Sequence, residues 1–228
     1  MNNWLDFFNI FINGAALSLS VLGLWFSAIV PGIDRWTKRF FLNYFTVLLL
    51  CCFACFLEFV LYLFPVSSAA IQFILILESL LLSMPMPMLT TYLLHCCGEN
   101  LRSSKLFHTV IGLWSVFFVL IISTPFSSVF TYIAPDKQFR RGVLYPLMLL
   151  PISATMLLNL IGTIRRRKQL SHKVFLSFLI ALLPMTVTLL VNMFVDVFPL
   201  VDISYVLSAL AMYSLILSEQ IEIGRAHV

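Results

Sequence analysis

Residues 40–64 read FFLNYFTVLLLCCFACFLEFVLYLF, an apolar stretch in which Glu58 is the single charged side chain. At a rise of about 1.5 Å per residue, a helix over this stretch is long enough to cross the roughly 30 Å hydrocarbon core of a bilayer. Because the bilayer interior holds no water, the backbone polar groups of such a stretch must bond to one another, as they do in an α-helix. We therefore predict a transmembrane helix, with a charged loop at residues 34–39 before it and Pro65 after it.

Similar apolar runs lie on both sides of this one. The chain has 228 residues, of which 61% are hydrophobic and 11% charged, whereas soluble domains carry about 25% charged residues. We predict an all-α, polytopic membrane bundle of about seven transmembrane helices. The first run is expected to be retained, because it is too long for a signal peptide and no basic residue precedes it. The runs cover residues 7–30, 40–64, 69–94, 106–123, 143–164 and 174–197, and the last ends near residue 217.

Lys and Arg are distributed unevenly between the connecting loops. Short cytoplasmic loops carry the excess of positive charge in membrane proteins. Here the odd-numbered loops hold most of it, so we predict that the N-terminus lies outside and that the chain after the seventh helix is cytoplasmic. The odd-numbered loops hold Arg35, Lys38, Arg39, Arg102, Lys105, Arg165, Arg166, Arg167, Lys168 and Lys173, and the even-numbered loops hold Lys137, Arg140 and Arg141.

The sequence changes character after residue 217. We assign residues 1–217 to the transmembrane domain and the polar residues 218–222 to the start of a cytoplasmic helical linker. The final residues, EIGRAHV, match the translation of a sequencing adapter, so residues 223–228, or 222–228 if the adapter begins one residue earlier, are set aside. The natural chain is then expected to continue past this point.

The end of the seventh run carries a resemblance to a known family. Residues 215–222 read LILSEQIE and resemble the junction in bacterial sensor histidine kinases with an N-terminal multi-span sensor region. The resemblance implies a multi-pass protein of the bacterial cytoplasmic membrane that forms homodimers in a two-component system. This chain would then be its input region, without catalysis of its own, because it contains neither a phospho-accepting His segment nor a Gly-rich ATP lid.

Ionisable side chains within membrane spans are rare and are usually functional, because a charge in hydrocarbon is costly. Glu58, Glu78 and Asp196 are such residues, and helix geometry places them in the outer half of the membrane. Asn192 shares a helix face with Asp196, four residues further on. We predict that these four residues line an outward-facing pocket for a small extracellular ligand that is cationic or forms hydrogen bonds.

A structural interpretation of the same residues remains open. Glu58 and Asp196 could simply reach the lipid headgroups, or Arg140 or Arg141 of the outer loop could neutralise one of them. Asp202 is expected on the same side of the membrane, near its surface.

The third run contains the sequence Met84-Pro85-Met86-Pro87-Met88. A proline within a helix frees a backbone carbonyl and bends the helix. We predict a hinge at Pro85 and Pro87 between the outer pocket and the inner face. The alternative is a static kink that neighbouring helices satisfy.

No metal, cofactor or nucleic-acid site is predicted, and the lipid bilayer is the main partner. We interpret the five cysteines as small apolar residues, since a site built from Cys51, Cys55, Cys96 and Cys97 would need all four at one membrane depth. No hydrolase or metalloprotease motif is present.

A small-solute transporter is the alternative to a sensor. Transporters are commonly built from internal repeats with matched broken helices, and the first three runs show no convincing repeat in the last three. A seven-span receptor is disfavoured, because the last run has neither a Lys nor an Asn-Pro-aromatic pattern.

Overall fold

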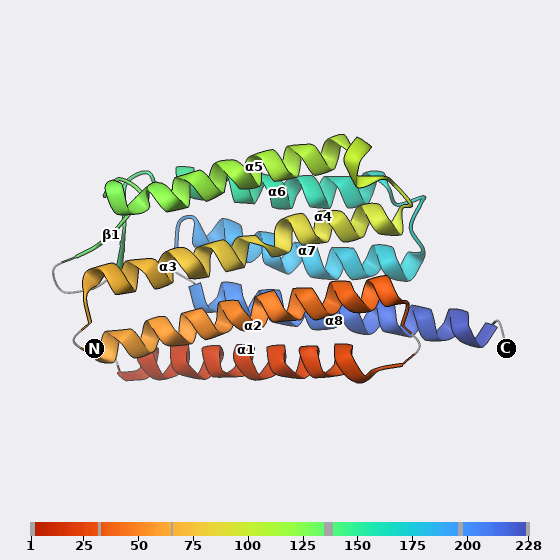
Figure 1. Cartoon of the computed structure of the whole chain (residues 1–228), viewed down its shortest axis with the longest axis horizontal. Helices are drawn as coiled ribbons and strands as arrows, with labels where there is room; N and C mark the ends of the chain where they lie inside the picture. Colours follow the sequence, from red (N-terminus) through yellow and green to blue (C-terminus); the bar gives the residue numbers. More distant parts are fainter. Residues whose placement is uncertain (1–2, 32, 65, 135–138, 196–197, 227–228) are drawn as a thin grey trace.

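The computed structural model describes residues 3–31, 33–64, 66–134, 139–195 and 198–226, and its helices lie side by side along one axis (Figure 1). Two short 3-10 turns and a two-stranded hairpin occupy the connections. The helices are α1 (Asn3–Ile29), α2 (Arg35–Leu63), α3 (Ser68–Ser83), α4 (Pro85–Cys96), α5 (Lys105–Ser123), α6 (Tyr145–Arg165), α7 (His172–Asn192) and α8 (Phe198–Ala226).

Within the described residues, seven helical stretches are long and apolar enough to cross a membrane. α3 and α4 together form one of them, Ser68–Cys96, because Met84 between them keeps a right-handed helical conformation. Large apolar side chains such as Trp25, Phe73 and Val119 are exposed on the outer surface, as contact with lipid tails permits. The prediction of an all-α, seven-span bundle is confirmed.

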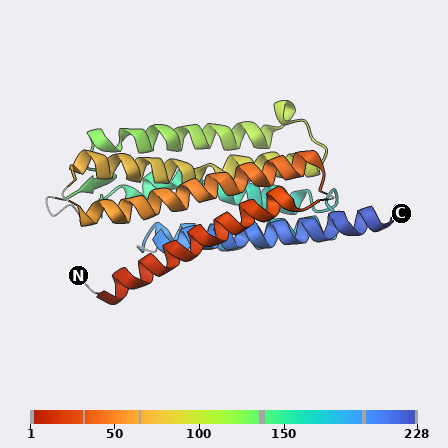
Figure 2. The same cartoon turned by 60° about the horizontal axis from the view of Figure 1, so that its bottom comes forward.

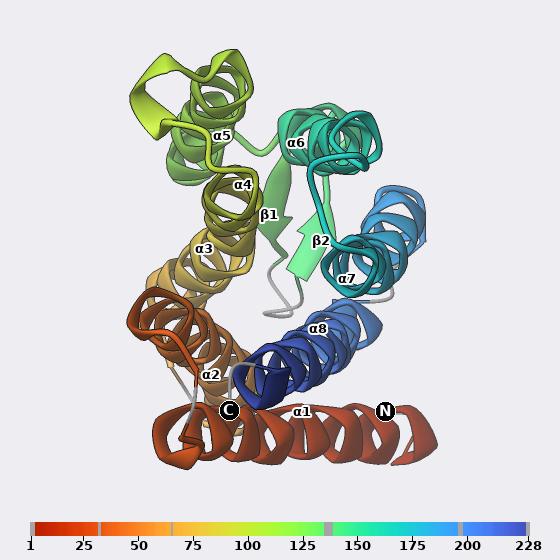
Figure 3. The ribbon, with the colours of Figure 1, turned by 90° about the vertical axis from the view of Figure 1, so that its right-hand side faces the viewer.

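The spans are arranged as a ring. Figure 3 looks along the bundle and shows α2, α3–α4, α5, α6, α7 and α8 following one another around it, while α1 packs outside against α2 and α8. Strands β1 (Thr131–Ile133) and β2 (Phe139–Arg141) form an antiparallel hairpin in the α5–α6 connection, with Thr131 opposite Arg141. The hairpin lies across the end of the ring where α3 and α8 begin (Figure 1).

The two termini lie at opposite ends of the bundle, and the C-terminal part of α8 extends past the other helices (Figure 2). The α1–α2, α4–α5 and α6–α7 connections share the end at which α8 emerges (Figure 1). The loops with the excess of Lys and Arg are therefore all at one end, which is the arrangement that the predicted orientation requires. We call this the inner end and the opposite one the outer end.

An ion pair joins two of the inner connections. Arg166 donates from Nε to Oε1 of Glu99 at 2.6 Å and from Nη2 to Oε2 at 2.9 Å. These hydrogen bonds lower the pKa of Glu99 and raise the pKa of Arg166. The pair holds the start of the α4–α5 connection against the end of α6.

α2 begins earlier than the sequence predicts. Residues 35–39 are helical rather than part of a loop, because Asp34 caps the helix: its Oδ1 accepts hydrogen bonds from the backbone N of Trp36 (2.9 Å) and Thr37 (3.0 Å). Partial burial raises the pKa of Asp34, but hydrogen bonds from Thr37, Gln220 and Trp36 outweigh it and hold the pKa below its usual value.

α7 ends earlier than the sixth apolar run, at Asn192 rather than near residue 197. At this end Arg141 of the hairpin donates from Nη1 to the backbone O of Asn192 (2.7 Å) and from Nη2 to its Oδ1 (2.9 Å). A helix-terminal carbonyl that a side chain satisfies needs no further helical turn. The Arg141 guanidinium also lies 4.4 Å above the ring of Tyr145.

The inner half of the bundle is packed with aromatic rings. Trp36 stacks on His95 with ring centroids 3.7 Å apart, and Phe40 stacks on Tyr92 at 4.3 Å. Further ring contacts join this cluster to α7 and α8 through Phe178 and Tyr213. The aromatic cluster ties α2, α4, α7 and α8 together, and the buried carboxyl groups lie in the other half.

Candidate functional site

One face of α2 carries three potential ligand groups. Cys51, Cys55 and Glu58 are spaced i, i+4 and i+7, which places them on one side of a helix. Both thiols are buried and Glu58 is half-buried. Glu58 lies five residues before the outer end of α2, about 7.5 Å along the helix axis.

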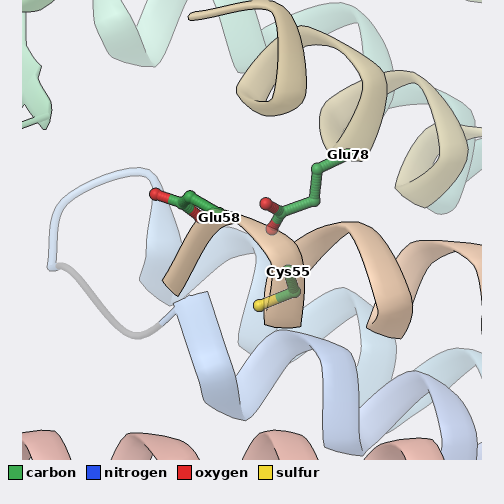
Figure 4. A group of neighbouring side chains, drawn as sticks. All are labelled: Cys55, Glu58 and Glu78. Carbon is green, nitrogen blue, oxygen red and sulfur yellow. The ribbon is translucent and has the colours of Figure 1, made fainter. Parts of the chain in front are cut away.

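Glu78 reaches this face from α3 (Figure 4). Its carboxyl group, the carboxyl group of Glu58 and the Sγ of Cys55 offer ligand atoms that all lie within 4.8 Å of one another. Glu78 is fully buried, and neither of its carboxyl oxygens has a hydrogen-bond partner among the described residues. The two predicted residues Glu58 and Glu78 are thus brought together.

Asp202 joins the same group from α8. Asp202 lies near the outer end of its span, as predicted, but its side chain is buried within the bundle and only 2% exposed. The Sγ of Cys51 lies 3.8 Å from Oδ1 of Asp202 and 3.9 Å from the backbone O of Glu78. Asp202 starts the second turn of α8, and packing against α2 turns it inward. We call Cys51, Cys55, Glu58, Glu78 and Asp202 the carboxyl–thiol cluster.

The cluster brings three carboxyl groups together within a membrane-spanning bundle. In surroundings of low dielectric constant, adjacent carboxylates cannot all carry a charge unless protons or a cation compensate for it. In the part of the chain that the structure describes, Oδ2 of Asp202 also lacks a hydrogen-bond partner. The arrangement is therefore suited to hold a cation or to exchange protons.

Asn192 belongs to a different place. It lines a mostly apolar cavity under the hairpin, together with Gln72, Thr124, Tyr132, Met148 and Tyr205, and neither Glu58 nor Glu78 is among the lining residues. The predicted single pocket is thus divided into the carboxyl–thiol cluster and this hairpin cavity. Asp196, the fourth predicted residue, lies outside the described residues.

The cysteines fall into two groups at different depths of the bundle. Cys51, Cys52 and Cys55 are buried in α2, whereas Cys96 and Cys97 end α4 at the inner end, and all five thiols are free. A site built from both groups is therefore excluded by their separation, as the depth argument anticipates. The interpretation of the cysteines as apolar packing residues is incomplete for Cys51 and Cys55, because their thiols lie beside carboxyl groups.

Span three bends at the predicted prolines. Pro85 is the first residue of α4, and Met84 joins α3 to α4. Above the bend, the Nε1 of Trp114 donates to Ser83 Oγ at 2.9 Å. This hydrogen bond supports the helix on the outer side of the kink. The hinge at Pro85 and Pro87 stays a prediction.

Asn159 of α6 clamps α4 directly below the kink. Its Nδ2 donates to the backbone O of Met86 at 3.1 Å, and its Oδ1 accepts from Thr90 Oγ1 at 2.6 Å. Both Asn159 and Thr90 are buried. The clamp supplies a polar partner for a backbone carbonyl next to the prolines.

Thr90→Val is expected to destabilise the protein by about 1–2 kcal/mol, because it keeps the shape of the side chain but leaves Oδ1 of Asn159 buried without a donor. Thermal unfolding in detergent would measure the loss. Thr91→Val is the matched control, since Thr91 bonds only to Pro87 O of its own helix at 2.8 Å. The double variant Thr90→Val/Asn159→Leu is expected to recover most of the loss, and a double variant that is as unstable as the sum of the two single ones would contradict the clamp.

Sequence reasoning missed three members of the cluster. For Cys51 and Cys55 a signal exists, because their spacing to Glu58 places all three on one helical face. For Asp202 the sequence shows only how far the residue lies from the start of the seventh apolar run. This distance does not determine whether the side chain points toward lipid headgroups or toward another helix.

Comparison of the chain with protein-family models gives no match, and neither curated proteins nor solved structures give one. What the fold and the site define is a class: an α-helical membrane protein with seven spans that buries carboxyl and thiol groups in its outer half.

Proposed function

We propose that this chain is the membrane-embedded input region of a signal-transducing protein, in which a ligand in the outer half changes the position of α8. The observation that supports the proposal is the course of α8. Asp202 in its second turn belongs to the carboxyl–thiol cluster, and Tyr205 lines the hairpin cavity. The same helix continues without interruption to the inner end.

The inner end of α8 is held by polar contacts that a displacement would break. Gln220 donates from Nε2 to Oδ2 of Asp34 at 2.7 Å and accepts at Oε1 from the backbone N of Asp34 at 3.1 Å. Lys173 at the start of α7 donates from Nζ to Ser218 Oγ of α8 at 3.4 Å. A shift of one helix past its neighbours is a known kind of switching transition, and here it would exchange these contacts for others.

The output that this proposal implies is a cytoplasmic domain after α8. The resemblance of residues 215–222 to the exit of bacterial sensor histidine kinases favours a kinase of a two-component system, acting as a dimer in the bacterial cytoplasmic membrane. The polar and helical character of residues 218–222 supports this choice.

A small-solute transporter is the second candidate, and one observation favours it. Leu82 and Ser83, directly before the kink at Pro85, line the hairpin cavity. Broken helices beside a central cavity are typical of transporters. The contacts of Trp114 and Asn159 on either side of the kink, however, favour a fixed bend over a moving gate.

Hydrogen–deuterium exchange on the chain in lipid nanodiscs tests the sensor proposal. Asp202→Asn is expected to change the exchange of residues 215–222, about 20–30 Å away along α8. Leu207→Ala is the matched control, because Leu207 lies on α8 but faces lipid. Exchange that changes only around Asp202, or changes equally in both variants, would contradict a relay along α8. Solute uptake into vesicles, together with such a local change, would favour the transporter.

A further inference from the structure

We propose that the carboxyl–thiol cluster is a binding site for a divalent transition-metal cation of the Zn²⁺ type. Cys55, Glu58 and Glu78 provide the first ligands, and Cys51 and Asp202 stand next to them as further donors. The inference deepens the proposed function, since it names the ligand class of the input site, but binding itself can be measured without reference to signalling.

Two buried carboxyl groups point to a missing partner. Both oxygens of Glu78 and Oδ2 of Asp202 are buried and have no hydrogen-bond partner among the residues that the structure describes. Polar atoms that are buried without a partner are rare in folded proteins and call for an explanation such as a bound ion. Because Glu58 also interacts with Tyr62, the argument rests on Glu78 and Asp202.

The possible ligand atoms lie close to one another. Glu78 extends from α3 toward α2, where Glu58 and Cys55 lie (Figure 4), and the ligand atoms of the three are within 4.8 Å of one another. Side-chain rotations are enough to bring donors at such distances onto one ion. The ligands come from two helices, and Asp202 adds a third, so a bound ion would crosslink α2, α3 and α8.

The chemical nature of the donor atoms determines which cation the site prefers. Zn²⁺ accepts Cys sulfur together with Asp and Glu oxygen, whereas Mg²⁺ and Ca²⁺ take oxygen ligands alone. A thiol that lies beside two carboxyl groups therefore favours a borderline-soft divalent ion. On binding, the Cys55 Sγ–H bond breaks, the metal–sulfur bond forms, and the proton leaves to water.

The position of the site determines from which end of the bundle a cation can reach it. Glu58 is half-buried and lies about 7.5 Å from the outer end of α2, whereas Cys55 and Glu78 are buried beneath it. The aromatic cluster occupies the inner half below. A cation would thus reach the site from the outer end, with Glu58 as its first contact.

Cd²⁺ binding to the purified chain in lipid nanodiscs tests the site, because Cd²⁺ bound to a thiolate gives a charge-transfer band in the ultraviolet. We expect saturable binding of Cd²⁺ with this band, and displacement of Cd²⁺ by Zn²⁺. Cys55→Ser is expected to weaken the band, and Cys51→Ser/Cys55→Ser, which removes both thiols of the cluster, is expected to abolish it. Glu78→Gln is expected to weaken binding by at least about tenfold, the lower limit seen even for outer partners of a metal ligand.

Cys97→Ser is the matched control, since it removes a thiol at the inner end and is expected to keep both the band and the affinity. Circular dichroism and gel filtration of each variant ensure that only folded protein is compared. A wild-type chain without a saturable band would overturn the proposal. So would a band that persists in Cys51→Ser/Cys55→Ser, or equal displacement of Cd²⁺ by Mg²⁺, which would indicate a site of oxygen ligands alone.

The same preparation separates this inference from the sensor proposal. If Zn²⁺ binds but leaves the exchange of residues 215–222 unchanged, the metal site stands and the relay along α8 fails. If Asp202→Asn changes that exchange while Cd²⁺ does not bind, the relay stands and the metal site fails.

Discussion

Glu78→Met is expected to raise the stability of the metal-free protein by about 1–3 kcal/mol, the desolvation cost of a buried polar group without a hydrogen-bond partner. Glu78 is fully buried beside Glu58, and its carboxyl oxygens have no hydrogen-bond partner among the described residues. Folding therefore has to remove this group from water without a compensating bond. Methionine fills the same space and has no such cost. Thermal unfolding in detergent with a chelator present would measure the gain.

Glu99→Met is the matched control. Glu99 pairs with Arg166 at the inner end and remains partly exposed, so its replacement is expected to lower stability by less than about 1 kcal/mol. Added Zn²⁺ is expected to stabilise the wild type, because it binds the folded state, and to leave Glu78→Met unchanged. A Glu78→Met variant less stable than the wild type without metal would show that the carboxyl group has a structural role.

A gain in stability on removing Glu78 would also bear on function. Proteins keep a costly local feature mainly where it serves a site. The cluster breaks the rule that buried polar groups find partners, and it does so at the helix on which the proposed relay depends. Such a result would support the ligand-site interpretation of Glu58 and Glu78 over the structural one.

The number of the spans and most of their limits follow from the sequence because lipid admits few alternatives to an uninterrupted helix. The errors occur where a side chain acts on the backbone. Asp34 extends α2 to Arg35 by capping it, and Arg141 binds the carbonyl of Asn192 where α7 ends. Hydropathy treats both charged residues as loop, and it carries no information about the hydrogen bonds that they make.

The candidate site could be predicted only in part for a related reason. Depth along a helix can be counted from the sequence, and it places Glu58 and Glu78 at comparable heights. The rotation of one helix against another cannot be counted in this way. This rotation places Asp202 inside and puts Asn192 in a separate cavity. It also places the thiols of Cys51 and Cys55 next to carboxyl groups, although the sequence suggests that both cysteines are simply small apolar residues.

The contact of α1 with α2 depends on a similar detail at Gly23. Gly23→Ala is expected to destabilise the protein by about 2–3 kcal/mol, in the upper part of the range for overpacking. A Cβ at this position would lie 2.3 Å from Cε1 and 2.5 Å from Cδ1 of Phe45. The ring of Phe45 is completely buried and touches Tyr213, so it cannot move aside without disturbing α8. Thermal unfolding would measure the loss.

Gly14→Ala is the control on the same helix, because a Cβ at Gly14 would have no atom within 4 Å. It is expected to gain up to about 1 kcal/mol, since alanine favours helix more than glycine does. Gly23→Ala/Phe45→Leu should recover part of the loss, because the smaller side chain makes room for the added methyl group. Equal responses of Gly14 and Gly23 would mean that helix propensity alone governs α1, and that its close approach to α2 contributes nothing to holding α1 against the ring.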